Sequence, residues 1–248
     1  MVRNLMLVAV MIPFWTNFLI RTYAWIVLLN SEGIVNGALR GLGLVDGSVG
    51  LLYNDGAVII DARDSAAFGG FHIPGSINIG FEKQLANWVG MVVNPDAEII
   101  LVVDDREDYD RMVTELHRIG YDLIFGYLSG GIMAWLMSGR AVEQLEQTSP
   151  QQLKSQLEKS NIRIIDVRTP AEWSGGRIKW AEHFPLSDIL DDNFPKAEKG
   201  EELVLQCGSG YRSNIAASIM KQAGYAKVKS LAGGIFAWSN AGFPVVSN

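Results

Sequence analysis

The chain has 248 residues, of which 48% are hydrophobic and 19% are charged. This composition excludes an intrinsically disordered protein, and the length accommodates two domains of ordinary size. The net charge of −6 argues against nucleic acid as a partner. A single cysteine, Cys207, excludes intrachain disulfides and fits a reducing, cytoplasmic compartment. The three histidines are scattered, so we expect neither a metal nor another cofactor.

The N-terminal residues form the most hydrophobic part of the sequence. From Asn4 to Leu29 the only formal charge is that of Arg21, and aromatic residues crowd the second half. About 20 apolar residues are needed to cross a bilayer. We therefore expect a hydrophobic helical segment over residues 1–50 that contacts a membrane through residues 5–29. The alternative is a hydrophobic helix packed on soluble domains.

The same N-terminal residues resemble part of a known transporter family. The stretches that carry the resemblance to polyamine-type ABC transporter permeases are residues 11–25 (MIPFWTNFLIRTYAW), 41–46 (GLGLVD) and 51–60 (LLYNDGAVII). A permease needs several membrane spans and a coupling loop, which these residues lack. We therefore expect no transport activity and interpret the segment as a remnant that can anchor the rest of the chain.

An internal repeat follows the N-terminal segment. Residues 59–63 (IIDAR) match residues 164–168 (IIDVR), and residues 130–135 (GGIMAW) match residues 233–238 (GGIFAW) at nearly the same offset. The repeat predicts a first copy over residues 51–142 and a second copy over residues 148–248. Residues 143–147 form a polar linker between them.

Within the second copy, β-branched runs alternate with helical patterns. This alternation predicts an α/β fold in which each copy is a parallel sheet with helices on both faces. Ser149 and Pro150 open an amphipathic helix. The predicted strands are Ile162–Val167, Glu201–Gln206 and Val228–Leu231, and the predicted helices are Pro170–Trp173, Ser213–Ala223 and Ile235–Ala241.

Cys207 lies where the strand ending at Gln206 meets the next helix. Ligands of parallel sheets bind beyond the carboxyl ends of the strands. Backbone N–H groups and the positive end of a helix favour a thiolate there and attract a second anion. The bland alternative is an inert cysteine in the core. A catalytic role requires a sulfur atom that is not walled off from solvent.

The residues after Cys207 have the composition of an anion-binding loop. Gly208 and Gly210 permit tight backbone turns, and Arg212 supplies a cation for an anionic sulfur donor. Ser209 and Tyr211 are expected to donate hydrogen bonds to substrate oxygens. Ser213 comes next and is expected to cap the helix. The predicted binding residues are Gly208, Ser209, Gly210, Tyr211, Arg212 and Ser213.

Motifs in both copies resemble those of the rhodanese superfamily. In the first copy they are residues 61–63 (DAR), 71–78 (FHIPGSIN) and 130–135; in the second they are residues 166–173 (DVRTPAEW), 207–213 (CGSGYRS) and 233–238. The tandem is similar to the C-terminal half of proteins that join a metallo-β-lactamase-like persulfide dioxygenase to an inactive and an active rhodanese domain. The second copy departs from the pattern at residues 176–181. The resemblance implies two rhodanese-like domains and a loop that wraps its N–H groups around a persulfide on Cys207.

The predicted function is sulfur transfer through that Cys207 persulfide. The donor is thiosulfate or a small-molecule persulfide, and the acceptor is cyanide, sulfite or a thiol. The first alternative is a membrane-tethered carrier that holds a persulfide for a partner protein, either an acceptor or a persulfide-generating enzyme. The second is a cysteine-dependent phosphatase or arsenate reductase, which the loop disfavours: only four residues separate Cys207 from Arg212, and phosphatases of the fold have five.

Two further predictions concern the surroundings of the loop. Asp166 and Arg168 end a strand near the site, and Arg168 is expected to pair with Glu172 and hold the fold. In the first copy, alignment of the strand ends puts Asp104 in place of the thiol, within an acidic run from Asp104 to Asp110. The first copy is therefore expected to be inactive and to pack on the second copy or bind a partner.

Overall fold

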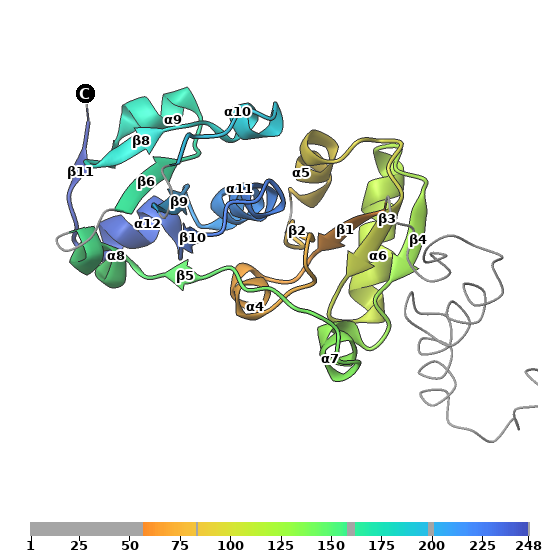
Figure 1. Cartoon of the computed structure of the whole chain (residues 1–248). Helices are drawn as coiled ribbons and strands as arrows, with labels where there is room; N and C mark the ends of the chain where they lie inside the picture. Colours follow the sequence, from red (N-terminus) through yellow and green to blue (C-terminus); the bar gives the residue numbers. More distant parts are fainter. Residues whose placement is uncertain (1–56, 83, 158–161, 198–200, 248) are drawn as a thin grey trace, which may run out of the picture. The chain divides into compact units, whose positions relative to one another are not determined.

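The computed structural model describes residues 57–82, 84–157, 162–197 and 201–247 (Figure 1). The hydrophobic segment predicted over residues 1–50, with its membrane contact through residues 5–29, lies outside these ranges. Within them, every helix is too short or too polar to cross a bilayer.

The first copy contains a parallel sheet of four strands in the order β2-β1-β3-β4. Helices follow β1, β2, β3 and β4 in turn, as the predicted alternation requires. The strands are β1 Val58–Asp61, β2 Ile77–Asn78, β3 Ile99–Val102 and β4 Ile124–Tyr127, and the helices are α4 Ser65–Gly70, α5 Leu85–Val92, α6 Arg106–Arg118 and α7 Gly131–Met137.

The second copy repeats this sheet and adds an edge strand, in the order β5-β10-β9-β6-β8. A short antiparallel pair joins β7 to β11. The strands are β5 Gln147–Thr148, β6 Ile162–Asp166, β7 Arg177–Ile178, β8 Ala181–His183, β9 Glu202–Gln206, β10 Val228–Leu231 and β11 Val245–Val246. The helices are α8 Pro150–Leu157, α9 Pro170–Gly175, α10 Leu186–Leu190, α11 Tyr211–Gln222 and α12 Gly234–Asn240.

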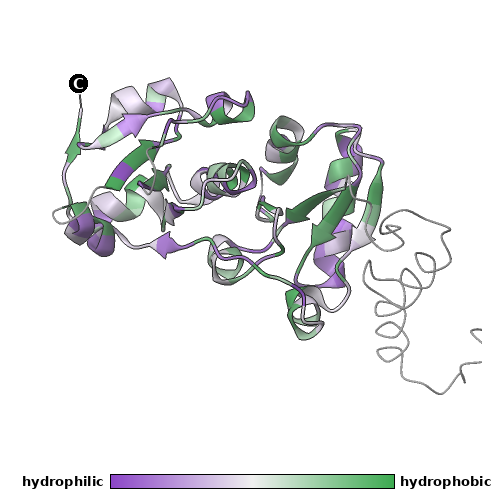
Figure 2. Ribbon diagram, in the orientation of Figure 1, coloured by the Kyte–Doolittle hydropathy of each residue, from purple (hydrophilic) through white to green (hydrophobic). Residues whose placement is uncertain are grey.

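The predicted α/β fold is confirmed, and the apolar sequences of the central strands explain why it forms. Strand β3 reads IILV and strand β9 reads ELVLQ, and Figure 2 shows β1 and β3 as mostly hydrophobic. Parallel strands are apolar on both faces because helices cover both. Burial is nearly complete along them: Leu101, Leu203 and Leu205 have no exposed surface.

Helix α11, which follows the cysteine loop, is buried on more than one side. Seven of its residues are buried, and they include the small side chains Ala216 and Ala217. One side packs on its own strands β9 and β10, and another contacts β2 of the first copy. Figure 1 shows α11 between the second sheet and β2. One hydrophobic cluster therefore runs through both copies, and the predicted packing of the first copy on the second is confirmed.

Asn78 at the end of β2 forms the polar centre of this contact. Its Nδ2 donates to the carbonyls of Asp61 and Arg63, both at 3.0 Å. Its Oδ1 accepts from Nδ2 of Asn214 on α11 at 2.9 Å, and its backbone N–H donates to Ser218 Oγ at 3.3 Å. The Asn78 side chain thus closes the first copy onto the helix that carries the cysteine loop.

We expect Asn78→Ala to lower the free energy of unfolding by about 2–4 kcal/mol, because buried acceptors and a buried donor lose their partners. Urea denaturation measures this change. Asn87→Ala is the matched control, since Asn87 is exposed on α5 and should change stability by less than about 0.5 kcal/mol. Equal effects of the two substitutions would contradict the role given to Asn78.

The predicted linker, residues 143–147, is built into the fold. Glu143 forms an antiparallel bridge with His72, Leu145 is completely buried, and Leu145 N–H donates to the Gly69 carbonyl at 3.1 Å. Gln147 then begins β5. Residues 143–147 therefore join the two copies as a packed, hydrogen-bonded segment and do not form a free polar linker.

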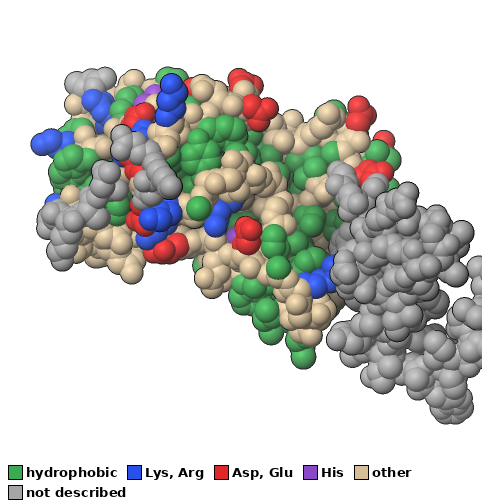
Figure 3. All heavy atoms as spheres, in the orientation of Figure 1, with side chains coloured by type: hydrophobic (Ala, Val, Ile, Leu, Met, Phe, Trp, Pro, Cys, Tyr) green, Lys and Arg blue, Asp and Glu red, His purple; other side chains and the backbone are tan. Residues whose placement is uncertain are grey.

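The outer edge of the first sheet differs from that of the second. Strand β5 covers β10 in the second sheet, whereas β4 has no further neighbour among the described residues. Several apolar side chains at β4 and α7 are exposed: Leu123, Phe125, Met133, Leu136 and Met137. Figure 3 shows hydrophobic atoms at the α7 end of the face.

Candidate active site

The cysteine loop is a four-residue turn between β9 and α11. Cys207 follows the last residue of β9, and α11 begins at Tyr211. Gly210 is the N-cap residue with φ of 101°, a left-handed conformation that favours glycine. The helix thus starts two residues earlier than predicted. The expectation that Ser213 caps it is wrong, because Ser213 lies inside the first turn.

The sulfur atom of Cys207 meets one backbone amide and one hydroxyl. The Gly210 N–H donates to Sγ at 3.2 Å, and Ser213 Oγ lies 3.7 Å from Sγ. Ser213 Oγ donates to the Gly210 carbonyl at 3.0 Å and shares a hydrogen bond with Ser230 Oγ at 2.9 Å. A negative charge on Sγ would therefore be stabilised by the Gly210 amide and the N-terminus of α11.

Cys207 is more enclosed than a catalytic thiol was expected to be, with 1% of its surface exposed. At the next residue, Gly208, an added Cβ would be 3.3 Å from the Phe236 ring and 3.4 Å from Arg212 Nη2. The Phe236 side chain is itself 63% exposed. The expectation that Sγ is open to solvent is therefore wrong in this structure, and access to Sγ requires neighbouring groups to move.

The start of α12 rests directly on the cysteine loop. Ile235 N–H donates to the Cys207 carbonyl at 2.8 Å, and Phe236 N–H donates to the Gly208 carbonyl at 3.1 Å. Gly234, with φ of 53°, makes this approach feasible, because a Cβ there would lie 2.3 Å from the Cys207 carbonyl oxygen. The second glycine of the GGIFAW motif therefore shapes the loop. Trp238 packs in the core, as predicted, with no exposed surface.

Arg212 does not point a free cation at the loop. Its Nη1 and Nη2 donate to the two carboxylate oxygens of Glu172, each at 2.6 Å. These bonds lower the pKa of Glu172 to about 2, helped by Thr169 and opposed by burial. The pKa of Arg212 is raised, first by Glu172 and also by Cys207. The predicted anion-binding cation is thus already paired with a carboxylate.

The predicted pair of Arg168 with Glu172 is wrong. Arg168 binds Asp166, with Nε to Oδ1 at 2.9 Å and Nη2 to Oδ2 at 2.6 Å. Arg63 makes the same two bonds to Asp61 at the same distances in the first copy. The same pair occurs in the first copy beside a strand end that lacks a thiol. We therefore infer that Asp166 and Arg168 stabilise the fold and have no direct role at the site.

The Tyr211 hydroxyl makes its hydrogen bond between the two copies. Its hydroxyl donates to the Gly80 carbonyl at 2.8 Å, and burial raises its pKa. Its ring lies 6.3 Å from that of Trp88 on α5. The prediction of a substrate hydrogen bond is therefore wrong for Tyr211. Ser209 is exposed, so its hydroxyl remains open to the expected hydrogen bond with a substrate oxygen.

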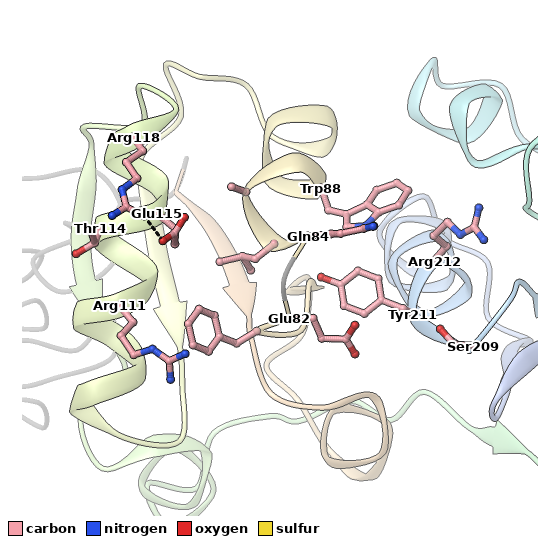
Figure 4. A pocket seen from close by; sticks show the side chains of 13 residues that line it. Glu82, Gln84, Trp88, Arg111, Thr114, Glu115, Arg118, Ser209, Tyr211 and Arg212 are labelled. Atoms are coloured by element: carbon pink, nitrogen blue, oxygen red, sulfur yellow. Dashed lines mark hydrogen bonds and ion pairs between the residues drawn. The ribbon is translucent and has the colours of Figure 1, made fainter.

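A cavity of about 1250 Å³ opens beside the loop (Figure 4). The second copy contributes Ser209, Tyr211 and Arg212, and the first copy contributes the opposite wall. Arg118 is paired with Glu115 across one turn of α6, and the Arg111 guanidinium lies 4.7 Å from the centre of the Phe81 ring. In the ranges that the structure describes, no three His, Cys, Asp or Glu side chains cluster as a metal site would require.

The alignment of Asp104 with Cys207 is wrong by one residue. Asp61 pairs with Val102 in the first sheet, as Asp166 pairs with Gln206 in the second. Val103, which is 3% exposed, therefore takes the place of Cys207. The loop of the first copy is one residue shorter, because α6 starts at Arg106.

The acidic run of the first copy belongs to a helix. Asp105 is the N-cap of α6 and accepts from the Asp108 N–H at 2.9 Å, and Glu107 lies in the same first turn. Carboxylates stabilise the positive end of a helix. A buried valine with a short loop still offers no nucleophile, so the expectation of an inactive first copy stands for a different reason.

The bond between Glu172 and Arg212 and the role of Asn78 were missed, although the sequence contained a signal for each. Glu172 stands three residues after Thr169, the spacing of a capping box, which fixes its carboxylate near the next loop. Asn78 stands between Ile77 and Ile79 in the sequence, where a buried amide needs partners. Neither signal identifies the partner, which is Arg212 for Glu172 and Asn214 for Asn78, because both partners lie far away in sequence.

Comparison with known proteins finds relatives that match part of the chain. The sulfurtransferase of Allochromatium vinosum is 36% identical over 87 residues, which are 35% of this chain and 80% of that protein. A rhodanese-related protein from Thermoplasma volcanium aligns with 26% identity and a TM-score of 0.38, over 42% of this chain and 99% of that one.

The permease resemblance of the N-terminal fragment is also confirmed. The spermidine/putrescine transport system permease protein PotB of Escherichia coli is 41% identical over 59 residues, which are 24% of this chain and 22% of that protein. The chain thus spans between about a fifth and four fifths of the curated relatives that it matches.

The family comparison covers most of the chain. The model of the rhodanese-like domain matches residues 49–138 and again residues 149–241. These two ranges hold the first sheet, the second sheet except β5, the paired Asp-x-Arg motifs and the cysteine loop. The chain therefore belongs to the rhodanese-like domain family, with two such domains in tandem.

Proposed function

We propose that the protein is a sulfurtransferase that carries sulfane sulfur as a persulfide on Cys207. The donor is thiosulfate or a small-molecule persulfide, and the acceptor is cyanide, sulfite or a thiol. The observation that supports this most is the 3.2 Å hydrogen bond from the Gly210 amide to Sγ, at the end of a strand and the start of a 12-residue helix.

The reaction has two balanced steps. The Cys207 thiolate attacks the outer sulfur of the donor, the bond between the two donor sulfurs breaks, and sulfite or a thiolate leaves with the electron pair. The terminal sulfur of the Cys207 persulfide is then attacked by the acceptor. With cyanide this gives thiocyanate and restores the Cys207 thiolate, so no external oxidant or reductant is needed.

The loop residues have separate roles in this proposal. The Gly210 amide stabilises charge on the cysteine sulfur. Ser213 Oγ lies 3.7 Å from the sulfur and is held by Ser230 Oγ and the Gly210 carbonyl. Ser209 is exposed at the cavity and meets the donor. Gly208 leaves room for the Phe236 ring. The loop thus binds the persulfide, and the cavity receives the rest of the donor.

Steady-state thiocyanate production from cyanide, with thiosulfate or an organic persulfide as donor, tests the proposal. The expected result is many turnovers per Cys207 with at least one donor. A protein that forms no thiocyanate and no persulfide with either donor would overturn it.

A second candidate function, a persulfide carrier for a protein partner, is favoured by the burial of Cys207. Because only 1% of the surface of Cys207 is exposed, a persulfide on this residue would be protected from small acceptors. A carrier would accept one sulfur per chain and release it slowly to cyanide. Comparison of the single-turnover loading rate with the steady-state rate separates the two functions.

A further inference from the structure

The positive charge of Arg212 beside the cysteine loop is already paired with a carboxylate before any donor arrives. Arg212 is the cation that follows the cysteine loop, and both of its terminal nitrogens are bound to Glu172 at 2.6 Å. With Cys207 as a thiolate, the three groups sum to one negative charge. A dianion such as thiosulfate would approach this charge with little compensation.

Glu172 is held in place by a second set of bonds. Its Oε2 accepts from the Thr169 N–H at 3.1 Å and from Thr169 Oγ1 at 2.9 Å, and its own N–H donates to Thr169 Oγ1 at 3.4 Å. This capping box fixes the carboxylate at the start of α9 whether or not Arg212 is present. The low pKa of Glu172 keeps it charged throughout the neutral range. Release of Arg212 to a donor would leave a fixed anion beside the loop.

The cavity beside the loop is larger than an inorganic donor requires. Its volume of about 1250 Å³ exceeds that of most small-molecule sites. Trp88, Phe81 and Tyr211 supply aromatic surface to its walls, and Figure 4 shows Trp88 beside Tyr211 and Arg212. Aromatic walls bind the apolar body of an organic molecule.

We propose that Glu172 is a specificity-determining residue that selects organic persulfides over thiosulfate as the sulfur donor. The organic body lies in the cavity against Trp88, and the terminal sulfur reaches Cys207. Cys207 attacks that outer sulfur, the sulfur–sulfur bond of the donor breaks, and the organic thiolate leaves. The proposal rests on the persulfide function and names its donor class.

The test measures the rate at which Cys207 gains one sulfur, by intact mass, with limiting thiosulfate or benzyl persulfide. For Glu172→Gln we expect the ratio of the thiosulfate rate to the benzyl persulfide rate to rise about tenfold, the effect of removing one charge at close range. Glutamine also closes a capping box, so α9 should remain capped. Asp122→Asn is the matched control, since Asp122 is an exposed residue before β4, and its ratio should equal that of the unchanged protein.

The cavity is tested by Trp88→Ala, which should slow loading from benzyl persulfide by at least threefold relative to thiosulfate. Thermal unfolding of each variant checks that the fold is kept. A ratio that stays the same in Glu172→Gln overturns the role of Glu172, and a ratio unchanged by Trp88→Ala overturns the placement of the organic body. Failure of the unchanged protein to load sulfur from either donor would instead overturn the proposed function.

Discussion

Cys207→Ser is expected to abolish sulfur transfer, with at least a thousandfold loss of thiocyanate production. Serine has nearly the same size, so the contacts of the loop with α12 should persist. A hydroxyl at neutral pH is a poor nucleophile towards sulfur and forms no persulfide. Because the chain has one cysteine, no second thiol can take over the reaction.

Asp104→Ser is the matched control for this variant. Asp104 is exposed and lies in the shorter loop of the first copy, where the structure places no nucleophile. Its activity should equal that of the unchanged protein. Substantial activity in Cys207→Ser, or its loss in Asp104→Ser, would contradict the assignment of the reaction to the second copy.

Gly234→Ala is expected to have the second largest effect, a loss of roughly 3–5 kcal/mol in the free energy of unfolding together with most of the activity. The added Cβ would lie 2.3 Å from the carbonyl oxygen of Cys207 and 2.6 Å from that of Gly208. Both are backbone atoms, so α12 and the cysteine loop would have to separate. Chemical denaturation and persulfide loading measure the two consequences.

The equivalent glycine of the first copy provides the control. Gly131 has φ of 63°, close to the 53° of Gly234, but the nearest atom to its added Cβ is 4.0 Å away. Gly131→Ala should therefore lose only about 1–2 kcal/mol, the cost of a left-handed backbone for alanine. If both variants lose the same stability, the close approach of α12 to the loop has no special importance.

The repeated motifs predicted much of the fold. The IIDAR and IIDVR runs became β1 and β6, and the strand before Cys207 became β9, because apolar runs with β-branched residues between helical patterns have few other structures available. The position of Cys207 at a carboxyl strand end followed from the same pattern. Short elements such as β5, β7 and α10 carry too few residues for a periodic signal.

Two of the errors concern partners that are distant in sequence. Glu172 binds Arg212, 40 residues later, whereas Arg168 binds Asp166, two residues before it. Asp104 was aligned from strand ends by sequence alone, and the pairing of Asp61 with Val102 shifts that alignment by one residue.

The double burial of α11 was also missed, although its composition indicated it. A surface helix has a polar face, and α11 carries Ile215, Ala216 and Ala217 with Ser213 and Ser218 on buried sides. Small side chains in place of a charged stripe are typical of a helix that packs between two layers. The sequence of the helix alone does not tell which surface of the first copy covers it.

The most direct test of the persulfide account is the intact mass of the protein before and after exposure to a sulfur donor. We predict a gain of one sulfur atom on Cys207, removed by cyanide with release of one thiocyanate per chain. No gain of mass with either thiosulfate or an organic persulfide, or a gain that survives in Cys207→Ser, would contradict the account.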